Sequence, residues 1–476
     1  MEIKIPEIDT SKIRSKELAE QVRQLINIIE AQAVYIRNLQ KEHEQLKEAI
    51  RKLQRQPKKP KFTKHEEKKG KKESTNAYSV TKLLGEEQQE WHKRSKKGKI
   101  PIDREIQLPE AKTCSCGSEE FTALRGFEKI TQGLVLKRDN VRYHGREKRC
   151  NDCGKIHRSQ LPPELKGSSF DPSLHTIISY FKFYCRMTHP LLHKLMIGFG
   201  IQISYGEITE ILHKNSDKLK KTYEHLRTVG YKKSAYLQSD ATGAKRKDKR
   251  TGKIIAQYIQ VISTRLISVF TITNKYNIPT VQKLLGKIGR WKPFESDDSS
   301  ANRNWLIERI RQLCWIHEIR HYMKLFPFFT PYQTARDNIL KLWGDYYHKA
   351  KKYKESPNKK EKGHLIKLFD EITSQITGFD LLDKQLRLTK KKKKELLAFL
   401  DYPFLPIHNN QCEQDLREAV IQRKISKETK SIAGNKSIAR HLSIIQTAQK
   451  QGLDVFKTLH GLLTGQLSSS ILTVNI

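Results

Sequence analysis

Residues 235–273 read AYLQSDATGAKRKDKRTGKIIAQYIQVISTRLISVFTIT, and this stretch decides the fold. Its runs AYLQSD, IIAQYIQVIS and RLISVFTIT are rich in β-branched residues and alternate in polarity, which is typical of strands. Short turns join them, one of which contains Thr251 and Gly252. The stretch therefore predicts three consecutive antiparallel strands. A helix at 280–288 and a short strand at 290–297 are predicted to follow.

Helical patterns lie on both sides of these strands. Apolar spacing predicts further helices, at 172–228, 304–400, 410–424 and 438–464. Two of the early helices flank a turn with Gly198 and Gly200, which predicts either a helix-turn-helix that reads DNA or a plain helical hairpin. The chain is therefore expected to be a multidomain protein, mainly α, with one α/β domain.

The N-terminal 56 residues carry a seven-residue repeat. One register holds leucines, at Leu18, Leu25, Leu39, Leu46 and Leu53, with Gln32 in the gap. The partner register holds β-branched residues, at Val22, Ile29, Ile36 and Ile50, with His43 in the gap. This arrangement favours a parallel two-stranded coiled coil, so residues 1–56 predict a homodimer or a higher oligomer. The alternative is a single helix that packs on its own chain.

Charge gives the first indication of a partner. The 476 residues hold 91 Lys and Arg against 52 Asp and Glu, a formal charge of +39. Eleven of these cations lie in 51–72 against two Glu, and residues 57–108 are expected to be a basic linker that contacts phosphates. No run of about 20 apolar residues suits a membrane span, and no signal-peptide core is visible. A nucleic acid is therefore the expected partner, with no membrane contact.

Four of the seven cysteines form two close pairs, Cys114 with Cys116 and Cys150 with Cys153. Each pair is followed by a glycine, which suits a tight turn around the sulfurs. Two such turns fit a tetrahedral four-cysteine site for one structural Zn²⁺, so residues 109–162 are expected to form a zinc ribbon. Free thiols are the alternative. Close pairs and an odd total favour a reducing cytoplasm over disulfides.

A second pattern suggests a different zinc chemistry. His317, Glu318 and His321 match the H-E-x-x-H motif of zinc metalloproteases. A third zinc ligand should follow at short range, but the next acidic residue is Asp337. The motif therefore does not favour a protease.

Three carboxylates form a more informative pattern. Asp240 is expected to end a strand before a Thr-Gly turn, Asp297 to end a later strand, and Glu413 to lie in the first turn of a helix. Two strand-end Asp and one helical Glu are what a two-metal nuclease needs to hold two Mg²⁺ about 3.5–4 Å apart. The alternative for Glu413 is a capping box with Asn410.

With these residues in place, the chain resembles the transposases of the insertion-sequence-66 type over nearly its whole length. The resemblance is carried by several segments in order, namely IPIDREIQLPEAKTCSCG, THPLLHKLMIGFGIQIS, SDATG, SDDSSAN, CWIHEIR, HNNQCEQDLREAVIQRK and IIQTAQKQGLDVFKTL. The most specific are CWIHEIR and the N-N-x-x-E-x-x-L-R pattern around Glu413.

The resemblance implies an RNase H-like catalytic domain at 233–424 with a helical insertion at about 305–405. It also implies a helical DNA-binding region at 163–232 and a C-terminal helical region at 425–476. The implied metal-binding set for two Mg²⁺ or Mn²⁺ ions is Asp240, Asp297 and Glu413. Supporting positions are expected at Asp298, His317, Arg320 and Arg417. Asp297 and Asp298 compete for one role, and counting to Ala301 favours Asp297.

The function implied is that of a transposase in the bacterial cytoplasm, associated with the nucleoid. Such an enzyme cleaves the terminal inverted repeats of a mobile element and joins the ends to target DNA by metal-dependent phosphoryl transfer. Accessory transposition proteins are further expected partners. The alternative is a non-catalytic protein or repressor, derived from a transposase, that binds the repeats.

Overall fold

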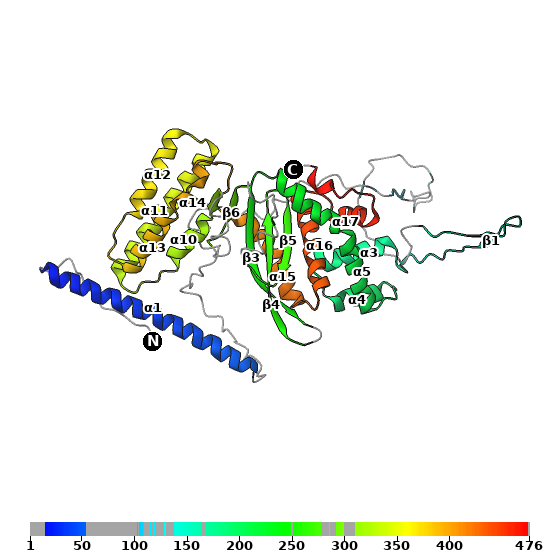
Figure 1. Ribbon diagram of the computed structural model, residues 1–476, viewed down its shortest axis with the longest axis horizontal. Coiled ribbons are helices and arrows are strands. Elements are labelled where there is room, and N and C mark those ends of the chain that lie inside the picture. The colour runs from blue at the N-terminus through cyan, green and yellow to red at the C-terminus, as the bar shows by residue number, and fades with distance from the viewer. Residues whose placement is uncertain are drawn as a thin grey trace.

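The computed structural model describes residues 15–53, 138–162, 168–248, 251–277, 292–298 and 310–474, with short pieces at 102, 104–108, 115, 119, 128–129 and 285. A five-stranded sheet stands in the centre, with a helical bundle to one side and further helices to the other (Figure 1). The helix expected at 280–288 lies outside the described residues except for Leu285, which is helical. No helix within the described ranges is long and apolar enough to cross a membrane.

The central sheet has the strand order β5-β4-β3-β6-β7. Its strands are β3 (Leu237–Lys247), β4 (Ile254–Ser263), β5 (Ser268–Thr273), β6 (Phe294–Ser296) and β7 (Arg311–Leu313). The first three are antiparallel, as the sequence predicts, whereas β6 runs parallel to β3 and β7 runs parallel to β6. Because parallel strands point the same way, the carboxyl ends of β6 and β7 lie at the same level of the sheet.

β3 is longer than the sequence analysis predicts. The expectation that a strand ends at Asp240 before a turn is wrong, because β3 continues to Lys247 and pairs with β4 over ten residues. The Thr-Gly pair lies inside the strand, where β4 supplies its hydrogen-bond partners. The pairing of β3 with β6, in contrast, covers only Leu237–Ser239 of β3. Asp240 therefore marks the point where pairing with β6 stops, while β3 itself goes on.

Helices cover both faces of the sheet. On one face, α15 (Asn410–Ser426) packs Leu416 against Val261 of β4. On the opposite face, Ile262 of β4 belongs to a core shared with the helices that precede the sheet. These helical elements are α3 (Pro172–Ser179), η3 (Tyr180–Tyr184), α4 (His189–Gly198), α5 (Tyr205–Lys218), α6 (Lys220–His225), η4 (Leu226–Gly230) and α7 (Tyr231–Lys233). The two faces thus bury alternate residues of the same strand.

α16 (Ile432–Lys450) lies along the outer edge of β5. The Phe270 N–H donates to Ser443 Oγ (2.8 Å), and the Ser268 N–H donates to Thr447 Oγ1 (3.1 Å). These hydroxyls satisfy strand groups that an open sheet edge would expose. α16, α17 (Val455–Thr464) and η7 (Ile471–Thr473) also share a core with α5 and the sheet, so this core crosses the boundaries expected at residues 232 and 424.

A helical bundle lies between β7 and α15 in the chain, where the insertion is expected. Its elements are α10 (Trp315–Met323), α11 (Thr330–Glu355), α12 (Lys359–Thr373), α13 (Asp380–Lys391), α14 (Lys393–Leu396) and η6 (Ala398–Leu400). Trp315, Trp343 and Phe369 pack ring against ring at its centre. Trp315 begins α10 directly after β7, so this aromatic core joins the bundle to the edge of the sheet.

α1 (Lys16–Leu53) lies against this bundle (Figure 1). Ile26 is buried in the bundle core, and Arg37 stacks on the Phe328 ring. Glu30 Oε1 accepts hydrogen bonds from the backbone N–H groups of Phe328 and Phe329, each at 2.7 Å. Several seam leucines stay exposed, at Leu18, Leu25, Leu39 and Leu46. The helix therefore packs on its own chain through another face, and the coiled coil remains a prediction.

Candidate active site

The parallel pairing of β3 and β6 positions the two aspartates. Ser239 is the register partner of Ser296, so the next residues, Asp240 and Asp297, leave the paired region side by side. The Asp240 carboxylate accepts the Ala241 N–H at 2.8 Å. The 57 residues between them (297 − 240) are enough to return the chain beside the first strand, and the parallel pairing of β6 with β3 fixes which residues meet.

Burial raises the pKa of Asp240 to about 7. The negative charges of Asp297 and Glu413 contribute to this rise, while the Ala241 N–H and the Arg320 guanidinium oppose it. The carboxylates of Asp297 and Glu413 thus both lie within electrostatic reach of the buried Asp240. The structure therefore brings Asp240, Asp297 and Glu413 into one neighbourhood, and their role as a metal-binding set remains a prediction.

Glu413 reaches this neighbourhood from the first turn of α15. The helix has Asn409 as its N-cap with no side-chain cap hydrogen bond, so the alternative capping box with Asn410 is not formed. Asn409 instead donates through Nδ2 to Ser239 O (3.2 Å), which ties the start of α15 to β3 beside Asp240. The Glu413 carboxylate faces Arg320, at 3.4 Å and 3.5 Å, and His317 Nε2, at 3.6 Å.

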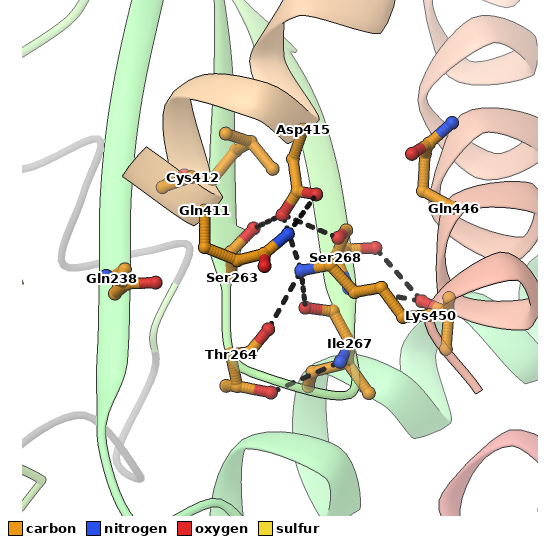
Figure 2. A network of polar contacts seen from close by, with 12 residues as sticks. Gln238, Ser263, Thr264, Ile267, Ser268, Gln411, Cys412, Asp415, Gln446 and Lys450 are labelled. Atoms are coloured by element: carbon orange, nitrogen blue, oxygen red, sulfur yellow. Dashed lines mark hydrogen bonds and ion pairs between the residues drawn. The ribbon is translucent and has the colours of Figure 1, made fainter. Parts of the chain in front are cut away.

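A buried polar network holds the rest of α15 on the sheet (Figure 2). Asp415 accepts hydrogen bonds from Ser263 Oγ and from Ser268 Oγ, the latter at 2.9 Å. Lys450 of α16 pairs with the same carboxylate at 2.5 Å and also donates to the carbonyl oxygens of Thr264 and Ile267. Because Asp415 follows Glu413 by two residues, this network fixes the rotation of the turn that carries Glu413.

Asp298 faces away from the carboxylate group. Its carboxylate pairs with Lys392 Nζ at 3.0 Å and with the Arg311 guanidinium at 3.8 Å. Arg311, whose side chain is 1% exposed, also donates to the Asp297 carbonyl oxygen at 3.0 Å. The structure thus separates the two neighbours: Asp297 acts on Asp240 electrostatically, and Asp298 joins the chain to the helical bundle.

Glu295 is a buried carboxyl that the sequence analysis missed. It is fully buried on β6, two residues before Asp297, and accepts a hydrogen bond from Gln238 Nε2 at 2.6 Å. Burial raises its pKa well above the usual value, while the hydrogen bond from Gln238 lowers it. In the sequence, Glu295 was visible only as a Glu between Phe294 and Ser296 in a predicted strand. An exposed Glu on an edge strand would give the same pattern, so the sequence did not indicate burial.

The H-E-x-x-H residues point in different directions on α10. His317 faces Glu413, whereas Glu318 is buried and accepts hydrogen bonds from Thr389 Oγ1 (2.5 Å) and Lys392 Nζ (2.7 Å). Glu318 therefore acts as a structural acceptor inside the bundle. In the described part of the chain, no group of three or more His, Cys, Asp or Glu side chains is arranged as a metal-binding cluster. Arg417 is exposed one turn after Glu413.

Cys150 and Cys153 form a knuckle between β1 (Glu147–Arg149) and β2 (Ile156–Arg158). The Gly154 N–H donates to Cys150 O (3.0 Å), and Gly154 has a φ of 69°, which glycine adopts without strain. Hydrogen bonds from the backbone of Cys153 and of Asp152 lower the pKa of the Cys150 thiol, as a zinc thiolate needs. Cys114 and Cys116 lie outside the described residues, so the zinc ribbon remains a prediction.

Two comparisons place this site among known proteins. The "Uncharacterized protein y4jO" of Sinorhizobium fredii (strain NBRC 101917 / NGR234) is 35% identical over 148 residues, which is 31% of this chain. This chain spans about half of that relative, because the match covers 46% of its length. The family model described as "Transposase IS66 family" matches residues 167–437, a span that contains the sheet, the bundle and all three carboxylates. Since this match covers more than half of the chain, the chain belongs to the IS66 family of transposases.

Proposed function

We propose that this chain is an active DNA transposase, which cleaves the ends of a mobile DNA element and joins them to target DNA by metal-dependent phosphoryl transfer. The observation that carries the proposal is the neighbourhood of Asp240, Asp297 and Glu413, which is acidic in a chain of formal charge +39. The middle of β3, the end of β6 and the first turn of α15 supply these residues, as in the RNase H-like arrangement that the resemblance implies. Such a gathering of carboxylates is costly without a cation.

The donor chemistry of these three residues suits Mg²⁺ or Mn²⁺, although the described side chains are not arranged as a metal-binding cluster. Carboxylate oxygens are the ligands that these hard cations prefer. Burial is the main cause of the raised pKa of Asp240, and the charges of Asp297 and Glu413 add to it, so a bound cation would favour the ionised carboxylate. When bound, the ions would activate the attacking oxygen and stabilise the leaving oxygen.

The supporting residues orient the carboxylates and the DNA. Arg320 and His317 hold Glu413 in the absence of DNA. The planar guanidinium of Arg320 suits a phosphate equally well, so we expect it to exchange Glu413 for the DNA backbone on binding. Lys392 and Arg311 hold Asp298 and thereby fix the backbone of Asp297. Arg417, exposed on the same helix as Glu413, is expected to contact DNA phosphates.

The remaining parts of the chain are proposed to supply DNA contacts and assembly. The basic linker at 57–108, a four-cysteine zinc ribbon at 109–162 and the helices of 163–232 bind terminal inverted repeats and target DNA. The helix α1 pairs two copies through its exposed leucines. This work takes place on nucleoid DNA in the bacterial cytoplasm, with accessory transposition proteins as further partners.

Nicking of a duplex that carries the terminal sequence of the element tests the function. Wild-type protein with Mg²⁺ should cleave the strand and then join its 3′-OH to a second duplex. Glu413→Gln should abolish cleavage and retain DNA binding, because the amide keeps the shape but weakens cation binding. Asp337→Asn is the matched control, since this carboxylate is 60% exposed on α11. Specific binding without cleavage by the wild type would instead support the repeat-binding protein or repressor.

A further inference from the structure

The edge of β3 beyond Asp240 is open on the side that β6 covers earlier. β6 pairs only as far as Ser239, and among the described residues the next partner on this side is Thr429, after α15. Thr429 N donates to Lys245 O at 3.2 Å, and Lys247 N donates to Thr429 O at 2.8 Å. Backbone groups alternate in direction along a strand, so Gly243, two residues before Lys245, presents its N–H to the same edge.

A basic cavity of about 410 Å³ occupies this edge. Gly243 and Lys245 line it from β3, and Arg423, Lys427 and Glu428 line it from the end of α15, so three cations face one carboxylate. Arg423 donates to Thr242 Oγ1 at 3.4 Å, which keeps the guanidinium against β3. A side-chain carbon at Gly243 would meet no described atom within 4 Å.

Lys427 lies in this cavity with a strained backbone. It follows the last residue of α15 and has φ 59° and ψ −141°, a combination that glycine adopts freely and other residues rarely adopt. Strained residues of this kind persist where the surrounding structure holds them and are frequent at ligand clamps. A lysine at a position suited to glycine therefore points to a requirement for its side chain.

We propose that this cavity binds one phosphate of the DNA backbone beside the cleaved bond. The proposal rests on the proposed function and deepens it. Arginine, lysine and a backbone N–H are the groups that bind phosphate oxygens. Arg423 follows Glu413 by ten residues on α15 (423 − 413), which places the cavity about 15 Å from the carboxylates. At about 3.4 Å per base pair, the bound phosphate lies about four to five base pairs from the cleaved bond.

Lys427→Gly gives the sharpest variant, because it removes the charge and the strain together. We expect this variant to melt at a higher temperature than the wild type because the backbone strain is gone. It should bind a pre-cleaved terminal duplex about tenfold more weakly. The salt dependence of its DNA affinity should fall by the equivalent of about one phosphate contact. Arg423→Ala should weaken binding similarly. Lys424→Ala is the matched control, since Lys424 is an exposed cation on the same turn that does not line the cavity.

A scan of single neutral methylphosphonates along the duplex locates the contact. Wild-type protein should lose affinity when the phosphate about four to five base pairs from the cut is neutral, and Lys427→Gly should be insensitive at that position alone. Two results would overturn the pocket while leaving the proposed function intact, provided that the wild type cleaves DNA. One is that the wild type and Lys427→Gly lose the same affinity at every methylphosphonate position. The other is that Lys424→Ala loses as much affinity for DNA as Lys427→Gly. Absence of DNA binding by the wild type would overturn both.

Discussion

α1 and α15 are both helices that the sequence predicts, but the molecule holds them in different ways. α15 is enclosed, with Leu416 on the sheet, Asp415 on Lys450 and Glu413 on Arg320. α1 is attached along one side only, and its Leu25 is 58% exposed. The comparison teaches that the spacing of apolar residues determines whether a helix forms. Long-range polar contacts determine which face of the helix is buried against the rest of the molecule.

The buried pair under α15 should produce the largest effect. Asp415→Asn leaves the Lys450 ammonium buried without a counter-charge, which should lower the free energy of unfolding by about 3–5 kcal/mol in urea denaturation. Adding Lys450→Met should recover part of this loss, and the double-mutant cycle measures the coupling. The exposed pair of Lys362 and Asp401 is the control, and Asp401→Asn should cost less than about 1 kcal/mol. Equal losses would show that α15 is not held by this network.

The carboxylates beside α15 should make stability depend on pH. Folding raises the pKa of Asp240 from 3.8 to about 7, so the folded state favours the protonated form. The contribution of Asp240 to the free energy of unfolding is fully present below about pH 4 and is lost as pH rises through about 7. Without divalent cations this loss amounts to about 4 kcal/mol in total. Asp240→Asn should therefore be more stable than wild type at pH 8 and equal to it at pH 4, measured by thermal unfolding. A constant difference across this range would contradict the assignment.

The attachment of α1 should be weaker than that of α15. Glu30→Ala removes the acceptor of the Phe328 and Phe329 N–H groups, at a cost of about 1–3 kcal/mol. We expect this cost to appear as local release of α1, with faster hydrogen exchange in α1 and unchanged exchange in β3 and β4. Glu20→Ala removes an exposed ion pair with Arg23 and serves as the control. Unchanged exchange in the Glu30 variant would mean that the other contacts of α1, such as Ile26 in the bundle core and Arg37 on Phe328, are sufficient to hold the helix.

The exposed face of α1 should show the smallest effect on stability and a clear effect on assembly. Leu39 is 45% exposed, so Leu39→Lys should change the free energy of unfolding by less than about 0.5 kcal/mol. Sedimentation of the full chain should nevertheless shift from dimer to monomer, because the lysine interrupts the leucine register. A monomeric wild type would show that α1 only packs on its own chain.

The sequence could predict the candidate site only where a carboxylate stands next to a strand or helix that the sequence also predicts. Asp240, Asp297 and Glu413 were expected next to two strands and one helix start, and this local context made them candidates. The family resemblance was needed to choose Glu413 over its capping role. Glu295 was not selected, because a Glu in a three-residue strand signals neither burial nor a neighbour. The length of β3 was misjudged as well, since a Gly followed by a basic run resembles a turn until β4 pairs with it.

The sequence by itself determined the three antiparallel strands, the helices of the bundle and the basic charge, because each depends on residue type and spacing within a short window. Only the tertiary structure decided that Asp240 and Asp297 lie side by side, that Asp298 faces Lys392, and that α16 covers the edge of β5. Those arrangements join residues tens to hundreds of positions apart. Their energy comes from burial and hydrogen bonds that exist only once the chain has folded.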